Sequence, residues 1–381
     1  MNKIYLDNNS TTQIDPEVLK TMLPYFDEKY GNPSSQSHAF GWESKAAVDI
    51  ARDKIAYLIN AKSDEIIFTS GATEANNLAI GGLLKAEKSK KYNIITSAIE
   101  HKAVLDIFNP MKNKTIFISP NKEGIININD IKKSINKSTI LVSIMHANNE
   151  IGSIQPIKEI GSLCKKHDII FHVDAAQSLG KVEIDVVDMN IDLLSISAHK
   201  IYGPKGIGAL YIKNKQPKIN IEPLIVGGGQ ENNYRSGTLP TPLIVGFGKA
   251  CEILLNRMRK DNLRIKKLSS SLIKAIISKY PDSILNGSTS HRIPGNINFS
   301  FPFLKGNSII RSMPQIAVSS GSACNSSDPK PSHVLIQIGR SKLEINTSLR
   351  IGIGRFNTEG HIKIAIDTII KAIDKKYNLS I

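Results

Sequence analysis

The sequence predicts an α/β protein with one large, doubly wound, mostly parallel sheet and a second, smaller α+β unit. The first observation is length, because 381 residues are enough for a large domain and a smaller one. The second is that apolar strand-like runs alternate with helix-like patterns between Ser70 and Lys200, as in parallel sheets. The third is that polar residues directly follow several of these strands, at the sheet edge where open α/β folds bind ligands.

The elements of the first half are predicted from apolar runs and from the residues that cap them. A short strand at Ile4–Leu6 leads into a polar turn, and Asp15-Pro16-Glu17 is typical of a helix start. Trp42–Ile59 has apolar residues at helical spacing, and Leu78–Leu84 is a further apolar helix. Strands are expected at Ile66–Thr69, Asn93–Thr96, Ile140–Met145, Ile169–Val173 and Ile191–Ile196.

The second half predicts a smaller unit that a long helix joins to the large one. After Gly208 we expect an edge strand, and then a loop at Val226–Pro240 that is too polar and glycine-rich to belong to the core and is typical of a functional or interface loop. A long helix near Leu243–Ile277, whose pattern allows breaks, is expected to cross into the second unit. The remaining expected elements are strands near Ile284, at Asn296–Phe301 and at Arg350, and a helix at Thr358–Tyr377.

These patterns divide the chain into three parts. Residues 1–12 are expected to form an N-terminal arm that packs with the small domain. Residues 13–255 form the large domain that carries most of the candidate site, and residues 256–381 form the small C-terminal domain with Cys324 and Arg350.

The composition favours some partners over others. Lysine and arginine number 49 against 34 aspartates and glutamates, which gives a formal charge of +15. The basic residues are scattered, and no basic run is interleaved with aromatic residues as in single-strand nucleic-acid binders. We therefore expect a modest attraction to acidic proteins and no nucleic-acid partner.

The number of cysteines and the hydropathy of the sequence indicate the cellular compartment in which the protein works. Cys164, Cys251 and Cys324 are too few and too scattered for a disulfide framework or a zinc site, and the first two fall in apolar helical patterns of the core. The N-terminal residues have no apolar signal core, and no apolar run approaches the roughly 18 residues of a membrane span. We therefore expect a soluble, cytoplasmic protein in a reducing compartment, without a membrane partner.

Lys200 is the residue around which we build the candidate site. It follows a buried strand in the stretch SISAHKIYGPKGIG, after Ser197 and His199 and before three glycines. A lysine amine at a strand end, beside hydroxyl and imidazole groups, suits a Schiff base with an aldehyde cofactor. Taken alone, a lysine in so lysine-rich a chain is more often a solvated loop residue.

Asp174 makes the cofactor interpretation specific. It ends the strand before that of Lys200, and Gln177 follows three residues later. Neighbouring parallel strands would bring Asp174 and Lys200 to the same sheet edge. Pyridoxal phosphate enzymes need a carboxylate to keep the pyridine nitrogen protonated. An aspartate after a strand is otherwise usually a helix cap, so it is the pair that predicts the site.

Polar residues after three further strands extend the predicted site. The turn Ser70-Gly71-Ala72-Thr73 either holds a phosphate with its backbone N–H groups or simply caps a helix. His101 either stacks over a planar cofactor or caps a helix. Asn148-Asn149-Glu150 either builds a turn or hydrogen-bonds a ligand, because such polar groups are costly to bury alone.

Two residues of the second unit complete the chemistry. Cys324 lies in the Ser/Gly-rich stretch SSGSACNSS and has no apolar face, so we interpret it as a nucleophile rather than as an unused surface thiol. Arg350 follows in SLRIGIGRF, where a guanidinium would either grip a substrate carboxylate with two hydrogen bonds or form a surface ion pair.

Together these motifs resemble those of the group I cysteine desulfurases, the NifS/IscS type of the class-V aminotransferase family, and within it the housekeeping iron–sulfur-assembly members. The resemblance covers almost the whole chain and implies the pyridoxal phosphate (PLP)-dependent transferase fold type I and a homodimer. The motifs that carry it are, in order, YLDNNSTT, GNPSSQSHAFGW, FTSGATEANN, EHKAVLD, MHANNEIG, HVDAAQS, SAHKIYGPKGIGALY, GGGQE, RSGTLP, SSGSACNSS and SLRIGIGRF.

The resemblance implies a role for each candidate residue. Lys200 would bond the cofactor, Asp174 would lie at the pyridine nitrogen, Gln177 at the ring hydroxyl, and His101 would stack on the ring and take part in catalysis. The cofactor phosphate would be held by Ala72, Thr73, Ser197, His199 and, from the other subunit, Thr238.

For the substrate, the resemblance implies L-cysteine as the sulfur source. Asn149 would contact cofactor or substrate, and Arg350 would bind the cysteine carboxylate. Cys324 would accept the sulfur as a persulfide while alanine leaves, and would pass it to an iron–sulfur scaffold protein or to other acceptors, including those of tRNA thiolation. Cys324 would also be a candidate metal ligand, sharing an iron–sulfur cluster with the scaffold.

Departures from the family pattern are few. Val226 stands where many members have histidine, and Asn307 replaces a usual acidic residue. The sequence ends at Ile381, soon after the last expected helix, so we expect a reduced surface for scaffold docking. Two rival functions stay open at this point: another PLP lyase or aminotransferase, which would not need Cys324, and a non-catalytic docking subunit, which would not need Lys200 or Asp174.

Overall fold

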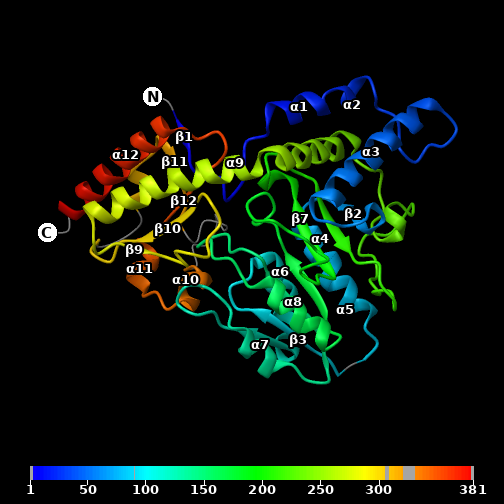
Figure 1. Cartoon of the computed structure of the whole chain (residues 1–381), viewed down its shortest axis with the longest axis horizontal. Helices are drawn as coiled ribbons and strands as arrows, with labels where there is room; N and C mark the ends of the chain where they lie inside the picture. The colour runs from blue at the N-terminus through cyan, green and yellow to red at the C-terminus, as the bar shows by residue number, and fades with distance from the viewer. Residues whose placement is uncertain (1–2, 90, 305–308, 321–330, 379–381) are drawn as a thin grey trace.

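The computed structural model describes residues 3–89, 91–304, 309–320 and 331–378. Its central feature is a seven-stranded sheet in the order β2-β8-β7-β6-β5-β3-β4 (Figure 1). All neighbouring pairs from β7 to β4 are parallel, whereas β8 runs antiparallel to both of its neighbours. The strands are β2 (Ile66–Thr69), β3 (Asn93–Ser97), β4 (Thr115–Ile118), β5 (Thr139–Met145), β6 (Ile170–Asp174), β7 (Leu193–Ser197) and β8 (Gly208–Ile212).

Helices cover both faces of this sheet because the strands are apolar on both sides. Successive residues of β6 show the alternation: Phe171 and Val173 belong to one buried cluster, and Ile170 packs on the other. One face is covered by α1 (Pro16–Met22), α3 (Ala39–Leu58), α7 (Ile128–Ser134), α8 (Ile157–Lys166) and the first half of α9 (Thr241–Lys279). The other is covered by α4 (Ala72–Asn76), α5 (Gly82–Ala86) and α6 (Lys102–Phe108). The predicted doubly wound, mostly parallel fold is confirmed.

The second unit has its own core around a three-stranded antiparallel sheet. The order is β12 (Leu349–Gly352), β10 (Asn296–Ser300), β9 (Ile284–Leu285). The second half of α9 and α12 (Glu359–Asn378) pack on it, so the apolar residues of α9 up to Leu254 lie in the large core and those from Ile265 onward lie in the small one. The domain limits drawn from the sequence stay a prediction.

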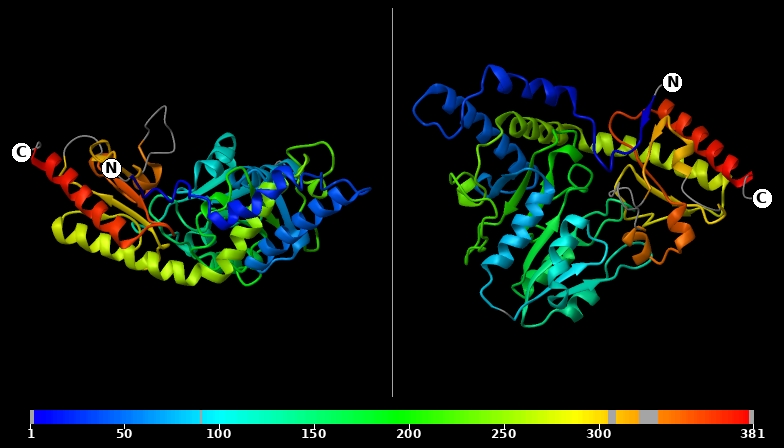
Figure 2. Two further views of the ribbon diagram at one scale, coloured as in Figure 1. Left: turned by 90° about the horizontal axis from the view of Figure 1, so that it is seen from above. Right: turned by 180° about the vertical axis from the view of Figure 1, so that it is seen from behind.

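The N-terminal strand lies beside the second unit, as both views of Figure 2 show. β1 (Ile4–Tyr5) pairs in parallel with β11 (Ile316–Ala317), and Leu6 is buried in the small core. The chain then crosses to the large domain, where Asp15 caps α1 through the backbone N–H of Glu17. The short helices that remain are α2 (Pro24–Asp27), α10 (His333–Gln337) and α11 (Lys342–Asn346).

Two sequence-based expectations were wrong. β8 is not an edge strand, because it is inserted between β2 and β7 and hydrogen-bonds to both. The loop at Val226–Pro240 is not wholly outside the core, because Glu231 is buried and pairs with Arg52 at 2.6 Å. The long helix, in contrast, runs as expected, and α9 is continuous from Thr241 to Lys279. No helix of the described residues is both long and apolar enough to cross a membrane.

Candidate active site

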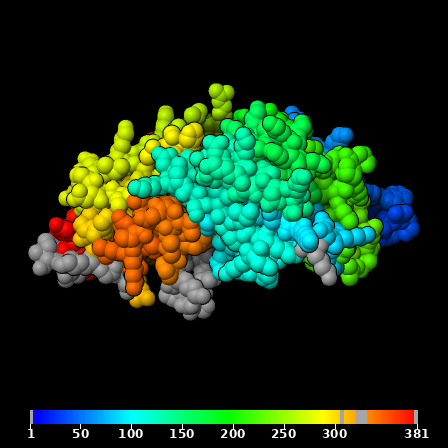
Figure 3. Space-filling model, turned by 90° about the horizontal axis from the view of Figure 1, so that it is seen from below, coloured from blue at the N-terminus to red at the C-terminus, as the bar shows by residue number. Residues whose placement is uncertain are grey.

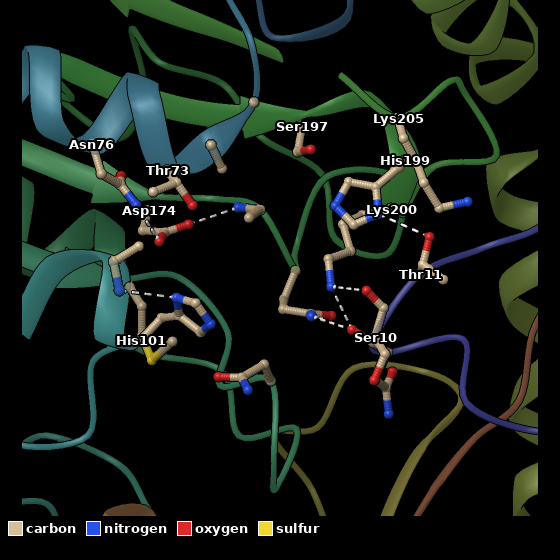
Figure 4. A pocket seen from close by; sticks show the side chains of 18 of the residues that line it. Ser10, Thr11, Thr73, Asn76, His101, Asp174, Ser197, His199, Lys200 and Lys205 are labelled. Carbon is tan, nitrogen blue, oxygen red and sulfur yellow. Dashed lines mark hydrogen bonds between the residues drawn. The ribbon is translucent and has the colours of Figure 1, made fainter. Parts of the chain in front are cut away.

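A cavity of about 650 Å³ lies where β5, β6 and β7 end and where α4 begins (Figure 4). This volume suits a small cofactor together with a small substrate. Ten of the residues singled out from the sequence line it: Ala72, Thr73, His101, Asn149, Asp174, Gln177, Ser197, His199, Lys200 and Arg350. They come together because β6 and β7 are adjacent and parallel, so that Asp174 and Lys200 lie at the same sheet edge.

Asp174 is a buried carboxylate with both oxygens engaged. Oδ2 accepts a hydrogen bond from Nδ2 of Asn76 at 2.8 Å, and Oδ1 accepts one from the backbone N–H of Ala176 at 2.9 Å. Such bonds fix the orientation of the carboxylate. Asn76 was not among the residues picked from the sequence, because SGATEANN was read only for its turn.

Lys200 points into the cavity and meets the N-terminal arm. Its Nζ donates to the backbone carbonyls of Asn9 at 2.6 Å and of Ser10 at 2.7 Å (Figure 4). The polar turn after β1, read from the sequence only as a turn, is therefore part of the site. Two carbonyl oxygens therefore hold the amine in place at the end of β7.

The end of the cavity next to α4 suits an anion. Gly71 begins the turn at φ +152°, a conformation that L side chains rarely adopt, and no atom lies within 4 Å of where its Cβ would be. The backbone can thus approach a ligand at the start of the helical stretch that α4 opens. Lys205 and Ser197 line the same cavity, so a cation and a hydroxyl complement the backbone N–H groups.

His199 contributes a neutral ring at this end. Burial, together with the positive charges of Lys200 and Lys205, lowers the pKa of His199 to about 4. Its Nδ1 lies 3.0 Å from the hydroxyl oxygen of Thr11, which again comes from the arm. At pH 7 the ring is therefore uncharged and can donate or accept a hydrogen bond but adds no charge.

His101 lies across the cavity from Lys200 (Figure 4). Its Nδ1 accepts a hydrogen bond from the backbone N–H of Ala103, so the residue caps α6 and lines the cavity at the same time. Burial lowers the pKa of His101, and the charge of Lys200 acts in the same direction, against Asp174. A neutral ring in this position could cover a planar cofactor. His101 can therefore cap α6 and stack on a cofactor at the same time, so the two interpretations drawn from the sequence are compatible.

Arg350 is buried, not part of a surface ion pair. Its Nη2 donates to Ser10 Oγ at 2.6 Å and to Asp7 Oδ1 at 3.1 Å, and Nη1 donates to the backbone carbonyl of Asn149 at 3.4 Å. Within the described part of the chain, Nε has no hydrogen-bond partner. A buried guanidinium with an unused donor, facing the cavity, suits a substrate carboxylate.

Two predicted site residues are not among the lining residues. Thr238 lines a different cavity, of about 170 Å³, with Tyr30 and Pro33. Cys324, like Asn307, lies outside the described residues. The described positions on either side of the Cys324 segment are nevertheless next to the site: the backbone of Ser319 pairs with that of Arg350.

On the other side of that segment, α10 is fastened to the large domain. Ser332 Oγ donates to Glu150 Oε2 at 2.5 Å, and His333 Nε2 lies 2.9 Å from the carbonyl oxygen of Glu100. Figure 3 shows this part of the surface, where the orange segment of α10 and α11 meets a teal segment of the large domain. Burial raises the pKa of Glu150 to about 7, although the Ser332 hydroxyl and Arg350 act against it.

Comparison with known proteins agrees with this geometry. The family model of the class-V aminotransferases matches residues 4–364. The cysteine desulfurase IscS of Rickettsia typhi is 52% identical over 99% of this chain and 92% of its own length. A solved NifS-like protein superposes with a TM-score of 0.89 at 33% identity, covering 98% of this chain and 99% of that one. SspA in complex with cysteine superposes with a TM-score of 0.82 at 38% identity, over 93% and 100%.

The fold is therefore that of the type I PLP-dependent enzymes, as the sequence predicted. The chain belongs to the class-V aminotransferase family and, within it, to the cysteine desulfurases. The cofactor of this family is PLP, and the donor set of the cavity fits it. The cavity is lined by an amine that can bond the PLP aldehyde and by a carboxylate that can hold the ring nitrogen. It is also lined by a helix start and a lysine that can hold the phosphate, and its size suits the cofactor.

Proposed function

We propose that this protein removes sulfur from L-cysteine, releasing L-alanine and leaving a persulfide on Cys324. The observation that carries the proposal is one cavity lined by Lys200, Asp174 and Arg350, with the backbone that leads into the Cys324 segment paired to Arg350. The relatives named cysteine desulfurase and the structure of SspA in complex with cysteine support this substrate.

The cofactor-facing residues would act as follows. PLP, when bound, supplies a ring that accepts electrons from the substrate. Asp174 would keep the ring nitrogen protonated, since both of its oxygens are held in place. Ala72, Thr73, Ser197 and His199 would hold the phosphate, and Gln177 and His101 would fix the ring. Lys200 Nζ would bond the aldehyde carbon of PLP in the resting protein and would act as the base for the proton on the substrate α-carbon.

The substrate-facing residues would position cysteine and take its sulfur. Arg350 would bind the carboxylate, with Asn149 beside it. The Cys324 thiolate would attack the substrate sulfur, so that an Sγ–S bond forms as the C–S bond breaks. The electron pair of the C–S bond stays on the substrate β-carbon, which is protonated before alanine leaves.

Chain connectivity supports Cys324 in this role. Cys324 is five residues beyond Ser319, whose backbone pairs with that of Arg350. Five residues can span up to about 18 Å, so the chain between Ser319 and Cys324 is long enough for the thiol to reach the cavity. Neither Cys164 nor Cys251 suits the role of nucleophile, because both are buried in helices and burial raises the pKa of each thiol.

The partners and the location complete the proposal. The protein would work as a homodimer in which Thr238 reaches the phosphate of the other subunit. It would hand sulfur to an iron–sulfur scaffold protein and to acceptors of tRNA thiolation, and Cys324 could share a cluster iron with the scaffold. We propose the cytoplasm as its location, because the described cysteines are free thiols, as in a reducing compartment.

Replacement of Cys324 tests the central claim. Incubated with cysteine, the wild-type protein should gain one sulfur on the peptide that contains Cys324, detected by mass spectrometry, together with alanine. Cys324→Ser should bind PLP and cysteine but form neither product at more than about 1% of the wild-type rate, because an alcohol is a poor nucleophile toward sulfur. Cys251→Ala serves as the control and should behave as wild type. Undiminished alanine formation by Cys324→Ser would refute the proposal.

A further inference from the structure

Lys181 lies beside the candidate site, although none of the roles above uses it. Its Nζ donates a hydrogen bond to Oε1 of Gln177 at 3.1 Å. No ion pair of Lys181 occurs among the described residues, and Asp261, the acidic residue of the small cavity next to it, is paired with Arg355 at 2.7 Å. Burial lowers the pKa of Lys181 to about 7, and the charges of Lys200 and Arg350 act in the same direction.

Gln177 connects this lysine to Lys200. Its Nε2 donates to the backbone carbonyl of Asn9 at 2.7 Å, and the same oxygen accepts a hydrogen bond from Lys200 Nζ at 2.6 Å. A chain of hydrogen bonds therefore runs from Lys181 through the Gln177 amide and the Asn9 carbonyl to Lys200. A cavity of about 30 Å³ is also lined by both lysines.

The two ends of this chain dictate the orientation of the Gln177 amide. Below its lowered pKa, the Lys181 ammonium only donates hydrogen bonds, and the backbone carbonyl of Asn9 only accepts them at any pH. If the amide were turned over, its NH₂ group would face the Lys181 amine and its oxygen would face the Asn9 carbonyl. Both contacts would then be repulsive, and two buried polar groups would lose their partners. The oxygen of Gln177 is therefore held toward Lys181 and its NH₂ group toward Lys200.

We propose that Lys181 is a positioning residue of the active site, which makes Gln177 a hydrogen-bond donor, never an acceptor, toward the cofactor bound at Lys200. PLP carries its hydroxyl on the ring carbon adjacent to the one that bears the aldehyde group, to which Lys200 would bond. A donor at this position favours the ionised form of that hydroxyl, whereas an acceptor would favour the neutral form. This inference rests on the proposed function, since it requires PLP at Lys200.

A double-mutant cycle tests whether Lys181 acts through Gln177. The variants are Lys181→Met, Lys181→Arg, Gln177→Ala and the double variant of Lys181→Met with Gln177→Ala; Lys165→Met, an exposed lysine on α8, is the control. Two quantities are measured: the PLP dissociation constant of the apoprotein and the position of the visible absorption band of the loaded protein. The band reports on the ionisation of the cofactor hydroxyl and is independent of turnover.

The expected result is specific to a role through Gln177. Lys181→Met should bind PLP about tenfold more weakly, and its band should move in the same direction as that of Gln177→Ala. Lys181→Arg keeps the donor and should match the wild type, as should the control. In the Gln177→Ala background, Lys181→Met should have no further effect. If Lys181→Met weakened PLP binding by the same factor in the wild-type and the Gln177→Ala backgrounds, the inference would be overturned. An unchanged absorption band in Lys181→Met would overturn it as well.

A folding check and the PLP binding of the wild-type protein distinguish misfolding, failure of the proposed function and failure of this inference. If Lys181→Met does not fold, as judged by circular dichroism and thermal unfolding of the apoprotein, Lys181→Gln replaces it. That variant keeps a donor without the charge, so its band should stay at the wild-type position, and a band displaced as in Gln177→Ala would contradict the role of the donor. A wild-type protein that fails to bind PLP would refute the proposed function itself, whereas a loaded wild type with an unaffected Lys181→Met would refute only this inference.

Discussion

Asn76 and Asp174 are 98 positions apart in the chain, yet Asn76 Nδ2 donates a hydrogen bond to Asp174 Oδ2 at 2.8 Å. Both side chains are buried, and the second carboxylate oxygen is held by the backbone N–H of Ala176. The start of the helical stretch after β2 thus fixes the carboxylate at the end of β6. Asn76 is therefore expected to orient the group that would hold the cofactor ring.

Asn76→Ala should weaken PLP binding about tenfold, because a buried carboxylate loses one of its two charge-assisted hydrogen bonds. Titration of the apoprotein with PLP measures this. Asn77→Ala is a matched control: the neighbouring side chain donates only to the carbonyl of Thr73, on the surface. Equal affinities of the two variants would show that Asn76 does not orient Asp174.

Lys200→Ala should abolish the covalent link to the cofactor and lower the rate of alanine formation by at least about 100-fold, because the amine is both the bonding group and the proton acceptor. Borohydride reduction followed by peptide mass spectrometry locates the modified lysine. Lys205→Ala, which removes a neighbouring amine of the same cavity, should retain the reducible link at Lys200. A link at any other lysine in the Lys200→Ala protein would contradict the assignment.

Arg350→Lys should raise the KM for cysteine about tenfold and leave PLP binding unchanged, because a lysine cannot offer the two parallel donors of a guanidinium. Initial rates over a range of cysteine concentrations give the KM. Arg311→Lys, at an exposed position of the same unit, is the control. A lowered kcat at unchanged KM would place Arg350 in a role other than carboxylate binding.

Thr238 lines a cavity away from Lys200 in its own chain, so it should act on the partner subunit. Thr238→Ala should bind PLP about tenfold more weakly. In a mixed dimer with Lys200→Ala subunits, one site would combine an intact Lys200 with an intact Thr238 from the partner. That site should regain wild-type affinity, measured by PLP titration of the purified mixed dimer. Weak binding at both sites would show that Thr238 acts within its own chain, and wild-type affinity of the Thr238→Ala homodimer would show that Thr238 does not contact the phosphate at all.

Glu100 makes folding depend on pH. Burial raises the pKa of Glu100 to about 8, and the charge of Asp174 adds to this. The folded state thus binds a proton that the unfolded chain releases near pH 4.5, so the stabilisation is complete below pH 4.5 and is lost as pH rises toward 8. Glu100→Gln should remove this dependence and raise the unfolding free energy at pH 8 by about 1–3 kcal/mol. Urea unfolding of the apoprotein at pH 5 and pH 8 compares the two proteins; parallel pH profiles would contradict the prediction.

The fold and the centre of the site were predictable because they follow from local patterns. Runs such as Ile140–Met145 are apolar except for one serine, which is typical of strands buried on both faces, and β5 forms there. The adjacency of β6 and β7 followed from their order in the chain, and it places Asp174 near Lys200. β8 was misjudged because a strand of the same composition can lie at the edge or inside, and only its antiparallel pairing with both β2 and β7 decides between them.

The sequence by itself determined the class of the fold. It also determined that Lys200, Asp174 and the turn before α4 form the site, because strand periodicity and chain order place these three groups at one sheet edge. Only the tertiary structure decided how these groups are held. Asn9 and Ser10 contact Lys200 from 191 and 190 positions away, and Asp7 meets Arg350 inside the protein. The physical reason is that such hydrogen bonds depend on how the arm and the two cores pack together, and short polar segments carry no periodic pattern that would reveal their partners.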